Sequence, residues 1–269
     1  MDKGVHSGSG GGIIPDTYRI LNNIIGRLEN TETGKVTEDL HVQIPGKVYL
    51  DCEKVCGIIG DSFVKSYAMG TDVKPMSDKT FENYLNRSQR PSLTVIGIDD
   101  VPACINGGNV IRPRTTIKVN MRLPPTLNLE KAKAVISEKV LSNPPYGAKI
   151  SLEWGMLGAG FSAPIYPSHL EDILNECARE SYDNNEVLFN HEGGSIPFMN
   201  ILTTRFPKSM FMVTGLLGPG SNAHAGNENL HVPTLKRLIH GMTRFCQKLA
   251  HVDFDFKDDE RPRGKSCKV

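Results

Sequence analysis

The chain has 269 residues, 39% of them hydrophobic and 23% charged, which excludes a wholly disordered protein. Its 31 basic and 30 acidic residues give a formal net charge of +1, so overall charge provides no attraction to nucleic acid or to an anionic membrane. The apolar stretches fall well short of the roughly 20 residues that cross a bilayer, and the first twelve residues lack the apolar core of a signal peptide. The six cysteines are too sparse for a disulfide scaffold, so we expect reduced thiols in a cytoplasmic protein.

The first part of the chain predicts one amphipathic helix followed by a polar insertion. Apolar residues after Asp16 recur at spacings of three and four, which predicts a helix. These residues are Tyr18, Leu21, Ile25 and Leu28. Asp16 stands just before this helix and can cap it. Residues 37–90 are mixed and polar, and we expect an insertion there with one helix near 51–68. Its buried side would be formed by Val55, Ile58 and Ile59.

From Pro91 onward the apolar period changes from that of a helix to that of a strand. Residues 92–98 are β-branched and short, and residues 116–123 alternate between apolar and polar side chains. A helix near 128–141 and a third alternating segment, 148–154, follow. Together with the first helix, these elements predict a small two-layer α+β domain.

The last third of the chain predicts part of an α/β layer. We expect a helix over 168–181, a glycine-rich turn, a short helix, a buried strand over 210–214 and a second glycine-rich loop that contains His224. A final helix carries an apolar stripe from Leu235 to Leu249. The tail from Asp253 mixes charges with prolines, so we expect it to be disordered.

Two glycine-rich segments in this part are candidates for ligand binding. In Glu192-Gly193-Gly194-Ser195-Ile196-Pro197, backbone N–H groups ahead of a helix suit a carboxylate or phosphate, although an ordinary capped turn has the same pattern. His224 lies in a loop of small residues after an expected buried strand, where α/β proteins place ligands. A hydrogen-bonded loop histidine is the alternative, since one histidine cannot hold a catalytic zinc alone.

The other two candidates lie in the first part of the chain. His6-Ser7-Gly8-Ser9-Gly10-Gly11-Gly12 precedes a helix like a phosphate cradle but lacks the Gly-Lys-Ser/Thr of a nucleotide site. A flexible linker would explain it equally. Arg122 stands on the polar face of its strand beside Lys118 and Asn120. It is either a clamp for a carboxylate or part of a solvated strand face.

The order of these motifs is more informative than any one of them. A His-Ser-Gly segment is followed by a Pro-Ser-Leu strand, Asn-Val-Ile-x-Pro, an Arg-Leu-Pro strand end, Glu-Gly-Gly-Ser-Ile-Pro and Ala-His-x-x-Asn-Glu. This succession, over residues 3–252, resembles the M20 metallopeptidases, and within them the carnosinase-like cytosolic dipeptidases.

The resemblance implies a fold and a division of the chain. Residues 1–160 would form a small two-layer lid, or dimerisation, domain that carries the insertion at about 37–90. This lid would be inserted in a zinc-peptidase-like α/β catalytic domain, of which residues 161–252 would be the C-terminal part. Residues 253–269 would be the disordered tail. The upstream half of that catalytic domain, with the other metal ligands and the catalytic glutamate, has no counterpart in this sequence.

The resemblance also implies roles for individual residues. His6 would reach across a dimer and stabilise the oxyanion in the partner's active site. Asn109 and Arg122 would contact the substrate near its C-terminal carboxylate. The loop that receives the substrate would be formed by Gly193, Gly194 and Ser195. His224 would bind one of two zinc ions, with manganese as an alternative metal.

The implied function is hydrolysis of short peptides with a free C-terminal carboxylate by a zinc-dependent dipeptidase. The expected partners are a short peptide and a second copy of the chain, with no nucleic acid and no membrane. Because His224 is the one credible metal ligand in the sequence, we expect the chain alone to be inactive. The alternative is a non-catalytic truncated paralogue that acts as a dimerisation or peptide-binding module.

Overall fold

The computed structural model describes residues 1–67, 69–193, 197–218 and 220–252. They form two compact units. The first unit comprises Met1–Ile165 and Leu188–Phe211, and the second comprises Tyr166–Val187 and Met212–Val269. The tail that was expected to be disordered, 253–269, lies outside the described residues. None of the helices in the described ranges combines the length and the apolar character that a membrane crossing requires.

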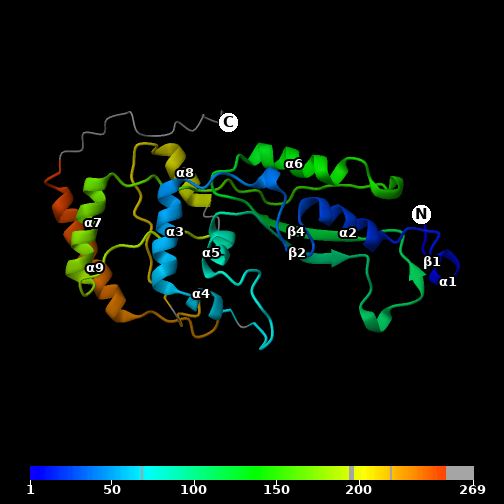
Figure 1. The fold of residues 1–269 in the computed structure, drawn as a ribbon, viewed down its shortest axis with the longest axis horizontal. Helices are drawn as coiled ribbons and strands as arrows, with labels where there is room; N and C mark the ends of the chain where they lie inside the picture. Colours follow the sequence, from blue (N-terminus) through cyan, green and yellow to red (C-terminus); the bar gives the residue numbers. More distant parts are fainter. Residues whose placement is uncertain (68, 194–196, 219, 253–269) are drawn as a thin grey trace. The chain divides into compact units, whose positions relative to one another are not determined.

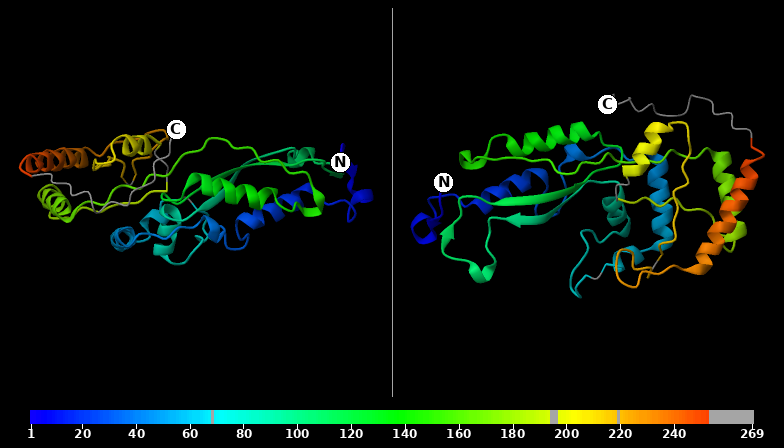
Figure 2. Two further views of the ribbon diagram at one scale, coloured as in Figure 1. Left: turned by 90° about the horizontal axis from the view of Figure 1, so that it is seen from above. Right: turned by 180° about the vertical axis from the view of Figure 1, so that it is seen from behind.

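The centre of the first unit is a two-layer arrangement of two helices on a two-stranded sheet. Strands β2 (Ser92–Asp99) and β4 (Thr116–Arg122) are antiparallel, with a bulge between Val95 and Gly97. Helices α2 (Thr17–Leu28) and α6 (Leu129–Leu141) lie side by side against one face of this sheet (Figures 1 and 2). A side chain caps the N-terminus of each helix. Asp16 accepts hydrogen bonds from backbone N–H groups in the first turn of α2, and Asn128 accepts one from the first turn of α6. These four elements confirm the sequence prediction.

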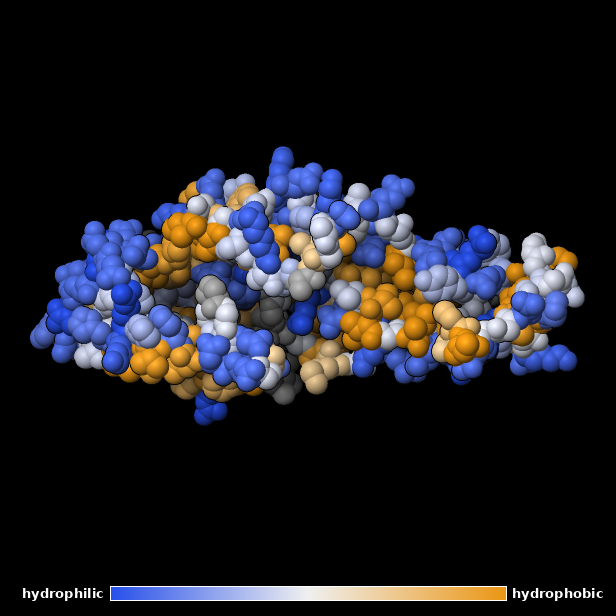
Figure 3. Space-filling view, turned by 90° about the horizontal axis from the view of Figure 1, so that it is seen from below, coloured by the Kyte–Doolittle hydropathy of each residue, from blue (hydrophilic) through white to orange (hydrophobic). Residues whose placement is uncertain are grey.

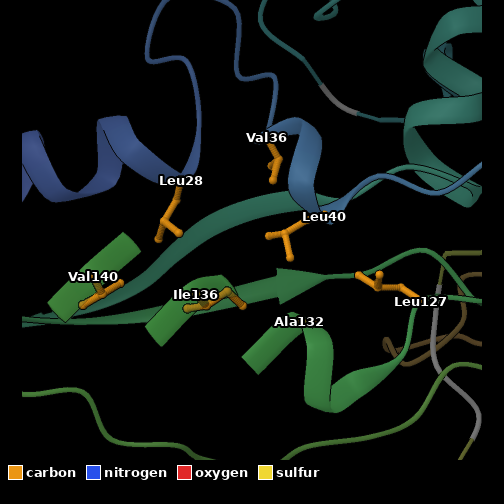
Figure 4. Close-up of a cluster of buried hydrophobic side chains, with 7 residues drawn as sticks. All are labelled: Leu28, Val36, Leu40, Leu127, Ala132, Ile136 and Val140. Carbon is orange, nitrogen blue, oxygen red and sulfur yellow. The ribbon is translucent and has the colours of Figure 1, made fainter. Parts of the chain in front are cut away.

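The hydrophobic core of this layer joins α2 and α6 to the segment between α2 and the insertion (Figure 4). Its buried residues are Leu28, Val36, Leu40, Leu127, Ala132, Ile136 and Val140. Ile150 and Leu152 also pack against it, although residues 148–154 belong to no strand. The predicted third strand is therefore wrong. The alternation of apolar and polar residues in 148–154 arises because every second side chain of this extended segment faces the core. An extended segment can do this without ladder hydrogen bonds to a neighbouring strand.

The insertion folds as its own helical cluster within the first unit. Helices α3 (Gly46–Ile59), α4 (Ser62–Lys65) and α5 (Thr80–Ser88) enclose a second core. The expected helix near 51–68 therefore begins earlier and is broken after Ile59, and α5 was not predicted. Ile58 is 69% exposed, so its predicted burial is wrong. The buried residues of this core are Cys52, Val55, Cys56, Tyr84 and Leu85.

Short elements complete the first unit. The N-terminal strand β1 (Val5–His6) pairs antiparallel with β3 (Val110–Ile111), and α1 (Ser7–Gly10) follows β1 directly. Single-turn 3₁₀ helices lie at η1 (Glu38–Leu40), η2 (Cys104–Asn106) and η3 (Pro145–Gly147). The helix α8 (Pro197–Arg205) also belongs to this unit.

The second unit contains two helices packed on each other, α7 (Ser168–Ser181) and α9 (Val232–Leu249). Ser181 and His240 join them by a hydrogen bond of 2.8 Å. Hydrogen bonds from Arg244 and Lys248 of α9 lower the pKa of Glu180 on α7 to about 2, so this carboxylate stays ionised. The strand predicted over 210–214 is absent from the described residues, where this segment has no regular structure.

Candidate functional site

The structure brings His6 and Asn109 together at the paired strands β1 and β3. His6 lies opposite Val110, and the backbone N–H of Ser7 donates to the carbonyl oxygen of Asn109 at 2.8 Å. The ring Nδ1 of His6 accepts a hydrogen bond of 3.1 Å from the N–H of Gly8, which orients the imidazole. Both side chains are exposed, so both are open to a ligand.

Arg122 is the last residue of β4 and lies opposite Ser92. Exposed residues alternate along β4 with partly buried ones, so Arg122 shares its face with Lys118 and Asn120, as predicted. The sheet therefore presents a guanidinium and an ammonium group on its open face. A planar guanidinium in this position can bind a carboxylate in a bidentate manner.

Gly193 lies directly against the insertion. A Cβ atom added at Gly193 would overlap the carbonyl oxygen of Arg87, the residue next to the end of α5. Only glycine lets the two backbones approach this closely. Gly194 and Ser195, the other two predicted residues of this loop, lie outside the described residues.

The segment before Gly193 is held by the hydroxyl group of Tyr84. Tyr84 is fully buried, and its hydroxyl donates to the side-chain oxygen of Asn190 at 2.6 Å. The same hydroxyl accepts the backbone N–H of His191 at 3.1 Å. One buried phenol therefore fixes both a side chain and a main-chain group of residues 189–193, which we call the anchored segment.

Arg87 holds the next residue of the anchored segment. Its Nη2 donates to Oε1 of Glu192 at 2.9 Å, and the side-chain amide of Asn190 donates to the same oxygen at 2.7 Å. The guanidinium carbon lies 5.2 Å and 5.3 Å from the ring centres of Phe63 and Tyr84. This stacking restricts the guanidinium to one orientation, which strengthens its role as a fixed hydrogen-bond donor.

His191 points back into the helical cluster, toward Asp51. Its Nε2 lies 3.9 Å from Oδ2 of Asp51, whose other oxygen accepts from Lys47 at 3.0 Å. Burial lowers the pKa of His191, and the neighbouring Asp51 carboxylate opposes this only in part. His191 is therefore neutral at pH 7.

We predict that the first unit loses stability as the pH falls below about 6.5. An unfolded histidine binds its proton near pH 6.5, whereas folded His191 binds it only at a lower pH. Between these values the unfolded state binds more protons, so the free energy of unfolding falls as the pH falls. Urea denaturation at pH 7.5 and pH 5, followed by fluorescence of the single tryptophan, Trp154 in the first unit, measures this.

The matched variants are His191→Gln and His6→Gln. We expect His191→Gln to reduce the loss of stability at pH 5 and His6→Gln, at an exposed histidine, to leave it unchanged. An unaltered pH dependence in His191→Gln would contradict the assignment.

His224 belongs to the second unit, where it lies in a loop without regular structure. Its backbone has a φ of 61°, and Asn222 and Asn227 are also left-handed, at 55° and 60°. Ser221 and Asn229 stabilise the loop through hydrogen bonds to the backbone of Gly218 and Gly220. The loop therefore exposes the imidazole on a tightly turned backbone.

The described residues do not fit a two-zinc centre on their own. Nowhere in the described ranges do three or more His, Cys, Asp or Glu side chains gather closely enough to hold a metal ion. A catalytic zinc ion usually takes about three protein ligands. His224 thus has no partners for a metal site within the part of the chain that the structure describes.

The sequence reasoning missed Tyr84, Arg87 and His191. A signal for α5 is present, because Phe81, Tyr84, Leu85 and Ser88 follow a helical spacing. No local signal connects them to residues 189–193, since Tyr84 and Asn190 are separated by 106 positions.

Comparison with known proteins identifies the fold. No family model matches the sequence, and no curated protein matches it either. Several solved structures match the fold. Three of them, with TM-scores of 0.63, 0.66 and 0.61, are the di-peptidase Dug1p from Saccharomyces cerevisiae, the M20 family metallo-carboxypeptidase Sso-CP2 from Sulfolobus solfataricus, and human carnosine dipeptidase 1. The fold is that of M20 peptidases.

The likeness extends over nearly all of this chain but only part of the others. It covers 94%, 91% and 94% of this chain at 20%, 18% and 19% sequence identity. The chain spans about half the length of these structures, 52%, 55% and 53% of each. The fold and the resemblance expected from the motif order are confirmed, and at this sequence identity the likeness shows the fold alone.

Proposed function

We propose that this chain forms part of a zinc-dependent dipeptidase that hydrolyses short peptides with a free C-terminal carboxylate. The observation that carries the proposal is the combination of an M20 fold over 94% of the chain with the motif order described above. The similar structures include two dipeptidases and one metallo-carboxypeptidase. A peptide substrate is therefore the chemistry common to all three.

The described side chains supply substrate binding. In the proposal, Arg122 and Asn109 bind the terminal carboxylate, and the backbone of Gly193 contributes to the loop that receives the peptide. His6 stabilises the oxyanion across a dimer, since an imidazole N–H can donate to the negative charge that develops on the carbonyl oxygen. Gly194 and Ser195 would belong to the same loop, and His224 would bind one of the metal ions.

A second candidate function is a non-catalytic module that dimerises or binds peptides. It is favoured by the lack of a cluster of metal ligands among the described residues. Substrate binding by Arg122 is common to both candidates, whereas turnover with bound zinc belongs only to the first.

Zinc titration and dipeptide assays on the full chain test whether it is active alone, and a negative result is compatible with both candidates. We expect no tight zinc binding and no turnover by the chain alone, because one imidazole cannot hold two zinc ions. Two equivalents of tightly bound zinc, with turnover abolished by His224→Ala, would contradict this expectation and favour the enzyme.

Peptide binding tests the role of Arg122. We predict that Arg122→Ala weakens the binding of glycyl-leucine, measured by calorimetry, at least tenfold, or about 1.4 kcal/mol. The melting temperature should hardly change, because Arg122 is exposed. Lys118→Ala removes a positive charge from the same face and should have a smaller effect. Equal losses in the two variants would indicate general electrostatic attraction and no specific carboxylate site.

We further propose a homodimer formed through the first unit and a cytoplasmic location. Cys52, Cys56 and Cys177 are buried as free thiols, and burial raises the pKa of Cys52 to about 11. These thiols are unreactive and suit a reducing compartment.

A further inference from the structure

We propose that the helical insertion is a positioning device for the substrate loop, and that Tyr84 and Arg87 are its positioning residues. This inference rests on the proposed function, because it takes Gly193 as part of the peptide-binding site. It assigns a role to residues 46–88, for which neither the motif order nor the sequence periodicity provides one.

The contacts run through the whole anchored segment. The ammonium group of Lys47 lies 5.3 Å from the centre of the Phe189 ring, and the hydroxyl of Tyr84 holds Asn190 and the N–H of His191. Arg87 holds Glu192 through its side chain, and its carbonyl oxygen lies directly against the backbone of Gly193. Each of the five consecutive residues 189–193 is therefore contacted from the insertion.

The character of these contacts argues for positioning rather than for simple packing. Apolar packing alone would tolerate small shifts along the chain, whereas hydrogen bonds to Asn190, His191 and Glu192 fix the segment lengthwise. Tyr84 is 0% exposed and its ring is packed edge-on against Phe63, 5.7 Å between centres. Its hydroxyl is thus a donor and acceptor at a fixed point.

The anchored segment leads directly into the loop that is proposed to receive the substrate. The last anchored residue, Gly193, is also the first predicted residue of the loop that receives the substrate. Backbone groups bind a peptide more tightly when they are held in position before the ligand arrives, because ordering them on binding would cost affinity. Tyr84 and Arg87 act on substrate through the backbone of Gly193 and touch no substrate themselves.

The experiment compares Tyr84→Phe with Tyr49→Phe in the full chain. Both variants remove one hydroxyl from the helical cluster. The ring of Tyr49 packs against Phe81, 5.0 Å between centres, and Tyr49 is 43% exposed, whereas the hydroxyl of Tyr84 is bonded to Asn190 of the anchored segment. Hydrogen exchange measured by mass spectrometry reports on residues 189–193, and calorimetry measures the affinity for glycyl-leucine.

We expect Tyr84→Phe to speed exchange in residues 189–193 at least tenfold and to weaken glycyl-leucine binding about tenfold, with unchanged exchange in β2 and β4. Tyr49→Phe should change neither. Arg87→Met should resemble Tyr84→Phe, and Arg87→Lys, which keeps the charge facing Glu192, should restore part of the affinity.

Three results would overturn the inference. The first is unchanged exchange in residues 189–193, and the second is faster exchange there with unchanged peptide affinity. The third is faster exchange throughout β2 and β4, since that would indicate a general loss of stability. A wild-type chain that binds no dipeptide would instead refute the proposed function, while the exchange comparison would still decide whether Tyr84 anchors the segment.

Discussion

Replacing Gly193 by alanine is expected to destabilise the first unit by about 2–3 kcal/mol, the upper range for overpacking at a well-packed site. The new methyl group would overlap the carbonyl oxygen of Arg87. Because this is a backbone atom in the last turn of α5, neither partner can move away by a change of rotamer. Thermal denaturation should show a fall of several degrees, since about 1 kcal/mol corresponds to roughly 2–4 °C in a chain of this size.

Gly57→Ala is the matched control. Gly57 lies within α3 of the same unit, and a Cβ atom added there would meet no other atom within 4 Å. Alanine is favoured over glycine inside a helix by up to about 1 kcal/mol, so this variant should melt at a slightly higher temperature. If Gly193→Ala were as stable as Gly57→Ala, the close contact between residue 193 and Arg87 would be refuted.

The sequence predicted those elements whose hydrophobic pattern and boundaries are both local. The helix after Asp16 and the strand 116–122 were found because capping residues and alternation lie within a few positions of each other. The segment 148–154 shows the limit of this reasoning. Its alternation correctly identifies Ile150 and Leu152 as facing the core, but strand pairing depends on a neighbour that local sequence does not specify.

The residues of the candidate site could likewise be predicted from the sequence only in part. The order of the motifs was enough to indicate the M20 fold and to select His6, Asn109, Arg122 and His224 as candidates. The pairing of β1 with β3, which joins His6 to the backbone of Asn109, and the contact between Arg87 and Gly193 connect positions about 100 residues apart. Such contacts have no local signature, so the anchored segment could be found only from the structure.

The edge of β2 is where we expect the second copy of the chain to bind. Val95, Ile96 and Ile98 are 44%, 54% and 45% exposed. Within the described residues β2 pairs only with β4, so one side of its backbone has no ladder partner. Figure 3 shows that apolar side chains gather on one face of the molecule. An exposed apolar edge strand is a template for pairing with another chain, and pairing about a two-fold axis would produce a closed dimer.

We predict that the wild-type chain sediments as a dimer at tens of micromolar and that Ile96→Lys weakens the dimer at least a hundredfold, or about 2.7 kcal/mol. Ile96 lies at the bulge of β2 and is exposed, so lysine there should not disturb the fold of the monomer. The charge would have to be desolvated in a dimer, and lysine is a residue that natural edge strands use to prevent pairing.

Ile105→Lys is the control for this substitution. Ile105 is 92% exposed and lies in η2, outside β2, so the same change of residue should leave the dimer intact. Circular dichroism should show equal helix content in the two variants. Because His6 would act across the interface in the proposed function, Ile96→Lys should also weaken any peptide binding that depends on a partner subunit. A wild-type chain that stays monomeric at high micromolar concentration would refute the dimer and, with it, the role of His6 in a partner's site.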